Sequence, residues 1–248
     1  MRYFILSDIH SNIEALQACI QRAKEAGYDS VLCCGDLVGY GPSPVEAIDG
    51  IRSLNAITIR GNHDRVAAGL DEATQFNPHA RRAVYWTRSV LPDSYREYLA
   101  NLPIGPLGIT EQAQLVHGAV TDEDDYIFTE ADADENFLLT DKQITFFGHS
   151  HFPVVYCSEA KGSSFPATSY EFDEFIAVKI EAGRQLFVNP GSVGQPRDGD
   201  SRASFAIWDE DRERMEFYRV EYDIELTQNK MREVQLPVYL IDRLAHGR

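Results

Sequence analysis

The chain has 248 residues, of which 44% are hydrophobic and 25% are charged, a composition typical of globular proteins. A chain of this length buries roughly 75% of its unfolded surface, so it forms a large core without disulfides or structural metal. Aspartate and glutamate number 39 against 23 lysines and arginines, for a formal net charge of −16. Because this charge opposes long-range attraction to nucleic acid and anionic lipid, we expect neither as a partner.

The four cysteines have neither the spacing of a zinc site nor that of a disulfide framework. The apolar run at the start of the chain is cut short by Asp8, and no stretch approaches the ~20 apolar residues of a membrane span. We therefore expect reduced thiols and a cytoplasmic protein with no membrane association.

The first sixty residues alternate short apolar runs with helical patterns. Apolar runs at residues 3–6, 31–34 and 57–59 predict strands. Helical patterns at residues 13–27 and from residue 43 predict helices between these strands. This order of strands and helices predicts a parallel sheet in an α/β fold.

The rest of the chain changes from helical to strand-like patterns. Residues 64–102 have mostly helical spacing, which predicts a helical insertion within a single domain of residues 1–248. Strand-like runs follow at residues 114–116, 144–147, 154–156, 175–180, 186–188, 203–208 and 215–220. Between these runs we expect a solvated acidic loop at residues 122–125 and a Gly/Ser/Pro-containing loop at residues 161–168. The strands of this β-rich half predict a core of two sheets.

Potential metal ligands directly follow five of the apolar runs. These residues are Asp8 with His10, Asp36, Asn62 with His63, His117, and His149 with His151. The carboxyl ends of strands in an open α/β sheet lie side by side, so we expect these side chains to converge on one point. Capping and turn functions at strand ends are the alternative, but five of the seven histidines fall in these clusters. The pattern therefore favours a metal site.

The ligand types indicate which ions fit. Imidazole nitrogen mixed with carboxylate and amide oxygen suits manganese, iron, nickel, cobalt or zinc better than calcium or magnesium. About seven ligands are too many for one ion, which favours two ions about 3.5–4 Å apart, an arrangement that serves phosphoester hydrolysis. Only Asp8 and Asp36 among these ligands are anionic, so two divalent ions would leave a local positive charge that attracts anions.

At these residues the sequence resembles the calcineurin-like metallophosphoesterases, whose motifs run D-x-H, G-D, G-N-H-D or G-N-H-E, H, and G-H-x-H. The matching segments, in the family's order, are Ser7-Asp8-Ile9-His10, Gly35-Asp36, Gly61-Asn62-His63-Asp64, Val116-His117-Gly118 and Gly148-His149-Ser150-His151. The resemblance implies a four-layer α/β/β/α sandwich with mixed sheets, and it implies a metal-dependent phosphoester hydrolase.

The resemblance also implies a function for each motif residue. One ion would be held by Asp8, His10, Asp36 and His151, and the other by Asp36, Asn62, His117 and His149. A hydroxide that bridges the two ions would attack phosphorus, and His63 would donate a proton to the leaving group. Manganese is the favoured metal for both positions.

Two further segments are similar to the YfcE-type phosphoesterases of bacteria and archaea. They are Gly39-Tyr40-Gly41-Pro42 and the segment from Asn189 to Arg197. The first lacks the arginine that Ser/Thr protein phosphatases carry in this loop, which argues against protein phosphatase activity. Arg197 is our candidate for a phosphate contact, with a structural ion pair as the alternative. For Asn12 a helix cap is favoured over a substrate contact.

We therefore expect a phosphodiesterase or phosphatase that acts on a small nucleotide-like substrate, with residues 64–102 covering the site. Dinucleoside polyphosphate hydrolysis also fits the ligands, whereas a nuclease would need a basic groove for which the sequence offers little material. A non-catalytic protein-binding scaffold is the alternative from another class of protein, and the complete ligand set argues against it. The sequence makes no prediction of the oligomeric state.

Overall fold

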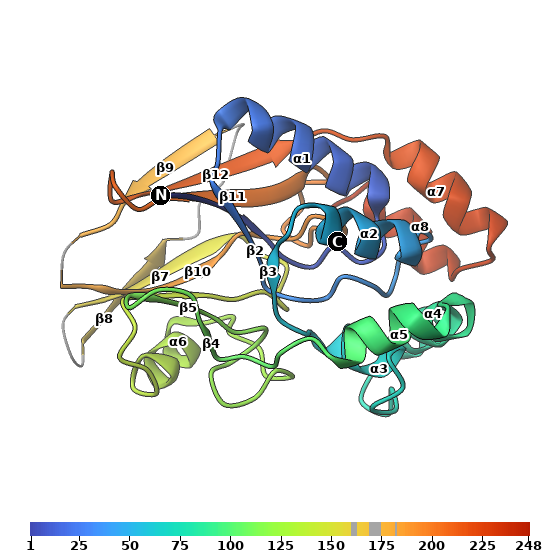
Figure 1. Ribbon diagram of the computed structural model, residues 1–248, viewed down its shortest axis with the longest axis horizontal. Helices are drawn as coiled ribbons and strands as arrows, with labels where there is room; N and C mark the ends of the chain where they lie inside the picture. The colour runs from blue at the N-terminus through green and yellow to red at the C-terminus, as the bar shows by residue number, and fades with distance from the viewer. Residues whose placement is uncertain (160–162, 169–174, 182) are drawn as a thin grey trace.

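The computed structural model describes residues 1–159, 163–168, 175–181 and 183–248. In this part of the chain, two six-stranded mixed sheets pack face to face, and helices cover both outer faces (Figure 1). The strand order is β3-β2-β1-β11-β12-β9 in the first sheet and β4-β5-β6-β10-β7-β8 in the second. The predicted four-layer α/β/β/α sandwich is confirmed.

The first sheet contains the three parallel strands predicted near the start of the chain. These are β1 (Arg2–Leu6), β2 (Ser30–Cys33) and β3 (Ile57–Thr58), connected by α1 (Ile13–Ala26) and α2 (Pro44–Ser53). Antiparallel pairing extends the sheet through β11 (Ala203–Asp209), β12 (Arg214–Val220) and β9 (Phe175–Lys179). The side chain of Asn12 caps α1 by accepting a hydrogen bond from the N–H of Ala15 at 3.2 Å. The buried face of α1 then packs on β11 and β12.

The second sheet has a parallel centre and antiparallel edges. The centre consists of β5 (Ala113–Leu115), β6 (Ile144–Phe146) and β10 (Gln185–Asn189). The antiparallel strands are β4 (Leu107–Gly108), β7 (Val154–Glu159) and β8 (Ser163–Thr168). Helix α6 (Glu130–Phe137) covers the outer face of this sheet through contacts with β7, β8 and β10.

The apolar core between the sheets holds the strand ends in place. Ile5 and Leu32 of the first sheet pack in one cluster with Phe146 and Val188 of the second, and all four are fully buried. Burial of each such side chain contributes about 1.5–3 kcal/mol to stability. This packing fixes β1 and β2 relative to β6, and these are strands that candidate ligands follow.

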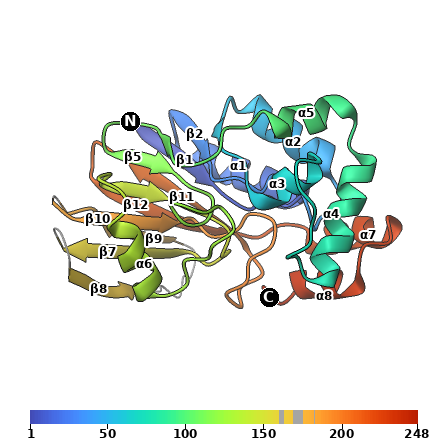
Figure 2. The same ribbon diagram turned by 90° about the horizontal axis from the view of Figure 1, so that it is seen from below.

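A group of helices lies beyond one end of the sandwich (Figure 1 and Figure 2). It includes α3 (Asn62–Ala67), α4 (Pro78–Val90) and α5 (Asp93–Ala100), which occupy the segment where the sequence predicts a helical insertion. The C-terminal helices α7 (Ile224–Glu233) and α8 (Val238–Leu244) join them. Leu240 and Ile241 pack in one buried cluster with Ala80 and Ala83 of α4. Among the described residues, every helix is too short or too polar to span a membrane.

The loop predicted at residues 161–168 is wrong for most of its length. Residues 163–168 form β8, while residues 161 and 162 lie outside the described residues. A proline within this stretch, Pro166, argues against a central strand. Because β8 lies at the edge of its sheet, a missing backbone N–H is tolerated there.

Candidate metal centre

The predicted ligands come together at the carboxyl ends of the strands. Asp8 and His10 follow β1, Asp36 follows β2, Asn62 begins α3 after β3, His117 follows β5, and His149 and His151 follow β6. Each of these side chains exposes no more than 6% of its surface. Backbone hydrogen bonds join two of the loops, from the N–H of Asp8 to the carbonyl of Gly35 at 3.1 Å and from the N–H of His10 to the carbonyl of Asp36 at 3.0 Å. The expected convergence is therefore present in the fold.

Most of the candidate ligands lie in strained backbone. Asp8, His10, Asp36, His149 and His151 have φ angles between +48° and +65°. Non-glycine residues rarely adopt this left-handed conformation, and each instance costs about 1–3 kcal/mol. Strain of this kind gathers at functional sites, where the surrounding structure holds it in place. Its concentration at one end of the sandwich is independent support for a site here.

Two groups of ligand atoms lie close together at Asp36, which belongs to one group and lies beside the other. In one group, atoms of Asp8, His10 and His151 lie within 4.8 Å of one another, and in the other the same holds for Asp36, His117 and His149. The carboxylate Oδ2 of Asp36 lies 3.4 Å from Nε2 of His117 and 3.7 Å from Nε2 of His10. The Oδ1 atom of Asn62 lies 3.3 Å from the same nitrogen of His117. Asp36 is therefore placed to contact both groups.

Backbone carbonyls orient four of the histidine rings. Each ring donates one N–H to a carbonyl oxygen, so its other nitrogen is left for the centre. The bonds are His10 Nδ1 to Val38 at 3.0 Å, His117 Nδ1 to Cys34 at 2.7 Å, His151 Nδ1 to Gln195 at 2.6 Å, and His149 Nε2 to Asp124 at 3.0 Å. This is the arrangement that fixes the tautomer of metal-binding histidines in proteins. It leaves Nε2 as the free nitrogen in three rings and Nδ1 in His149.

The electrostatics of the centre favour neutral rings for His10, His149 and His151 and an ionised Asp36 paired with a protonated His117. Burial lowers the pKa of His10 and His151 well below their usual range and that of His149 to about 3. For His117 burial acts in the same direction and is the largest single effect, but the charge of Asp36, its hydrogen bond to the ring and the charge of Asp8 together outweigh it and raise the pKa to about 10. The same pairing holds the pKa of Asp36 below its usual range, against the effect of burial. A metal ion would compete with the proton on His117 for the same lone pair.

A cavity of about 350 Å³ opens onto this centre. Its wall includes Asp36, Asn62, His149 and His151 of the candidate ligands, Gln75, Phe76, Asn77 and Ala80 from the helical segment, and Tyr40, His63, Asp124, Tyr126 and Arg197. The N–H of His63 donates to Oδ1 of Asp36 at 2.9 Å, and its ring packs against Tyr40 and Phe76. The buried Nδ1 of His63 has no hydrogen-bond partner among the described residues. The predicted catalytic residue therefore lines the cavity, and its unpaired Nδ1 is buried close to Gly39.

Arg197 reaches the same cavity from the loop after β10. Its guanidinium lies 5.6 Å from the ring of Tyr40, and Nη2 is 3.2 Å from Oε1 of Gln195. The buried Nε atom has no hydrogen-bond partner among the described residues, and these include no carboxylate paired with Arg197. The structural ion pair that the sequence left open is therefore not formed in this part of the chain. Asn12, by contrast, is used as the cap of α1 and also donates to the carbonyl of Gly194 at 3.0 Å, away from the cavity wall.

The acidic loop at residues 122–125, which the sequence predicts to be solvated, is in part buried and contacts residues of the centre. Arg65 forms ion pairs with Glu123 and with Asp124, the latter at 2.7 Å. The side chain of Glu123 is only 11% exposed and also faces Arg60 at 3.5 Å. The backbone carbonyl of Asp124 then orients His149. The feature of the sequence that comes nearest to indicating these ion pairs is Arg65, a basic residue directly after the Asn62-His63-Asp64 motif.

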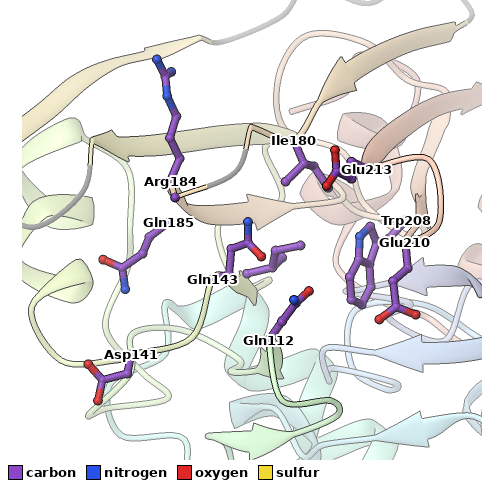
Figure 3. A pocket seen from close by; sticks show the side chains of 11 residues that line it. Gln112, Asp141, Gln143, Ile180, Arg184, Gln185, Trp208, Glu210 and Glu213 are labelled. Carbon is purple, nitrogen blue, oxygen red and sulfur yellow. The ribbon is translucent and has the colours of Figure 1, made fainter.

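A larger hollow of about 640 Å³ lies at the other end of the strands, beside the amino ends of β5, β6 and β10. Gln112, Gln143 and Trp208 lie around it, together with Glu210 and Glu213 (Figure 3). None of the candidate ligands lines it, and none of its described lining residues has a buried side-chain atom without a hydrogen-bond partner.

Comparison with known proteins identifies the family. The calcineurin-like phosphoesterase superfamily domain matches residues 1–213, so the chain belongs to this superfamily and the predicted phosphoester hydrolase is confirmed. The chain is 38% identical to a metallophosphoesterase from Sphaerobacter thermophilus, with a TM-score of 0.87 over 100% of this chain and 99% of that one. It is 35% identical over 251 residues to an uncharacterized protein of Methanocaldococcus jannaschii, which covers 98% of this chain and 97% of that protein.

A shorter match involves a nucleotide hydrolase. The symmetrical bis(5'-nucleosyl)-tetraphosphatase of Psychromonas ingrahamii is 36% identical over 67 residues, which are 26% of this chain and 24% of that protein.

Proposed function

We propose that the chain hydrolyses a small phosphoester at a centre of two divalent metal ions. Asp8, His10, Asp36 and His151 would hold one ion, and Asp36, Asn62, His117 and His149 would hold the other. The observation that carries this proposal is the position of Asp36, whose carboxylate lies within 3.7 Å of a histidine nitrogen in each of the two ligand groups. A carboxylate in that position would neutralise part of the charge of both ions when they are bound.

The donor set fits such ions. Neutral imidazole, carboxylate and one amide oxygen suit manganese, iron, nickel, cobalt or zinc, and we favour manganese. The histidine rings are already oriented by carbonyl groups, so binding requires little rearrangement of the side chains. When bound, two such ions would polarise the phosphoryl oxygens and lower the pKa of water toward neutrality.

Two side chains of the cavity wall would act on the substrate itself. Arg197 has a buried Nε with no partner in the part of the chain that the structure describes, and its planar guanidinium is suited to bind two oxygens of a phosphoryl group. His63 would donate a proton to the leaving oxygen. Burial lowers the pKa of His63 to about 4, and the negative charge of a bound phosphoryl group would favour the protonated ring.

The size and charge of the site support a small, nucleotide-like substrate. A cavity of about 350 Å³ falls within the usual range for small-molecule sites, and the segment around Phe76 closes one side of it. The net charge of −16 opposes the approach of a polyanion. The match to a bis(5'-nucleosyl)-tetraphosphatase favours dinucleoside polyphosphates as the second candidate class.

The proposal is tested by hydrolysis of p-nitrophenyl phosphate and of its bis-ester by the purified protein, with manganese and with chelator. We expect release of p-nitrophenol that depends on the metal, and the faster substrate distinguishes a phosphatase from a phosphodiesterase. No release with manganese, iron, nickel, cobalt or zinc would contradict the proposal and would favour a protein-binding scaffold.

A further inference from the structure

Three exposed aromatic side chains form a row beside the cavity. Tyr126, Phe128 and Phe152 are 45%, 51% and 38% exposed. The rings of Tyr126 and Phe128 are stacked, with centroids 4.8 Å apart and planes at 11°, and Phe128 meets Phe152 edge-on at 6.0 Å. Single exposed aromatic residues are ordinary, but three in contact form an apolar surface that requires an explanation. We call these three residues the aromatic row.

The aromatic row begins at the candidate metal centre. The ring of Tyr126 stacks on that of His149 at 3.9 Å and 24°, and Tyr126 lines the same cavity as Arg197. Phe152 directly follows His151 in the chain. Tyr126 and Phe128 therefore extend from His149 as stacked rings, and Phe152 meets Phe128 edge-on.

The loop that carries Tyr126 and Phe128 is held against the centre by a hydrogen bond and an ion pair. Asp124, two residues before Tyr126, accepts a hydrogen bond from His149 and pairs with Arg65. Tyr126 and Phe128 are thus held in place before a ligand binds, which lowers the loss of conformational entropy on binding.

Building on the proposed function, we propose that the aromatic row binds the nucleobase of a nucleoside phosphoester while the phosphoryl group lies in the cavity. In a nucleotide the flat base is separated from phosphorus by one ribose. In the protein, Tyr126 stacks directly on His149 and Phe128 stacks on Tyr126, so flat rings lie a short way from the centre. Every base has a π-face, so stacking accepts different bases. Arg197 interacts with Tyr126 at the cavity end of the row, where the phosphoryl group would lie, and the exposed rings of Phe128 and Phe152 beyond it offer an uncharged base an apolar surface.

The test compares two substrates that share the scissile bond and differ in the base. These are adenosine 5'-monophosphate and ribose 5-phosphate, or their p-nitrophenyl esters if the protein prefers diesters. We expect the wild-type protein to favour the base-bearing substrate through a lower KM. Phe128→Ala should reduce that preference by about 5- to 100-fold, and Phe152→Ala by less. Phe175→Ala is the matched control, because Phe175 is 46% exposed on β9 of the other sheet and should leave the preference unchanged.

The outcomes separate this inference from the proposed function. Metal-dependent hydrolysis of both substrates with equal kcat/KM by the wild-type protein would support the proposed function and overturn the base-binding inference. An equal loss on both substrates in Phe128→Ala would also overturn it. If neither substrate is hydrolysed, the proposed function fails, and saturation-transfer NMR with adenosine 5'-monophosphate still tests the aromatic row. Transfer to the base protons that is lost in Phe128→Ala supports base binding, and transfer that is unchanged in this variant contradicts it.

Discussion

The two hollows of the sandwich lie at opposite ends of the strands and differ in the side chains that line them. The larger one, of about 640 Å³, is lined by glutamine and acidic side chains around Trp208. The smaller one, of about 350 Å³, is lined by buried histidines and Asp36, and two of its lining residues, His63 and Arg197, each have a buried nitrogen with no hydrogen-bond partner among the described residues. Volume alone would select the wrong hollow.

The difference follows from strand direction. Loops at the carboxyl ends of β1, β2, β3, β5 and β6 bring side chains from five parts of the chain to one point, and most of these residues lie in left-handed backbone. The amino ends of the strands receive no comparable set of motifs. Converging polar groups, strained backbone and unpaired hydrogen-bonding atoms therefore distinguish the smaller hollow as the candidate site. Substitutions of single residues test these features.

The largest effect should come from the residue between the two ligand groups. Asp36→Ala should abolish binding of both metal ions and reduce hydrolysis to the background rate, because each ion loses its shared carboxylate. Metal content by mass spectrometry and p-nitrophenol release measure this result. Asp141→Ala, which alters the larger hollow, is the control and should retain both ions. Retention of two ions by Asp36→Ala would refute the bridging position.

Removal of the proposed proton donor should have the next largest effect. His63→Ala should keep both ions but slow turnover by about 10² to 10⁴-fold, the usual contribution of a general acid. The loss should be greater for an alkyl leaving group than for p-nitrophenol, because p-nitrophenolate leaves without a proton. A matched control is His79→Ala, since His79 stacks on Tyr239 outside the cavity wall. A loss that is equal for both leaving groups would speak against proton donation.

Arg197→Ala should lower kcat/KM by about 10- to 100-fold, which corresponds to the loss of a hydrogen bond to a charged group. Steady-state kinetics measure the change. Arg197→Lys should restore only part of it, because an ammonium group does not reproduce the planar fork of the guanidinium. Unchanged kinetics in Arg197→Ala would remove this residue from the substrate site.

A smaller effect should come from the ion pairs that fasten the acidic loop. Arg65→Gln should weaken manganese binding by about 10-fold, since Arg65 holds Glu123 and Asp124, and the carbonyl of Asp124 orients His149. Metal titration monitored by electron paramagnetic resonance measures the affinity. Arg96→Gln, which removes an exposed ion pair with Asp93, should bind manganese as the wild type does. Equal affinity in Arg65→Gln would show that the loop keeps its place without these ion pairs.

The smallest effect should be in the larger hollow. Gln143→Ala should change kcat/KM by less than about 2-fold and stability by no more than about 0.5 kcal/mol. Kinetics and thermal unfolding measure both quantities. A loss of activity as large as that of Arg197→Ala would show that the larger hollow also contributes to catalysis.

Much of this site could be predicted from the sequence because its ligands are side chains in short motifs. The convergence of Asp8, Asp36 and His149 follows from the rule that parallel strands end at one edge of a sheet. The α/β/β/α layers followed from the resemblance, and the strand runs indicated two sheets. What the sequence shows directly is therefore residue type and spacing.

The parts that could not be predicted depend on backbone and loop conformation. The groups that orient His149 and His151 are carbonyl oxygens of Asp124 and Gln195, and every residue has a carbonyl. The stacking of Tyr126 on His149 requires the path of the loop, which charge patterning described only as acidic. A capping box at Thr129 and Asp132 was visible in the sequence and marks the start of α6, so this helix could have been found.

The most direct test of the account is a titration of the metal-free protein with manganese, in which bound ions and hydrolysis of p-nitrophenyl phosphate or its bis-ester are measured in the same samples. We predict two ions bound per chain and full activity only when the second position fills. Full activity with one ion bound, or no activity with both bound, would contradict a two-metal centre bridged by Asp36.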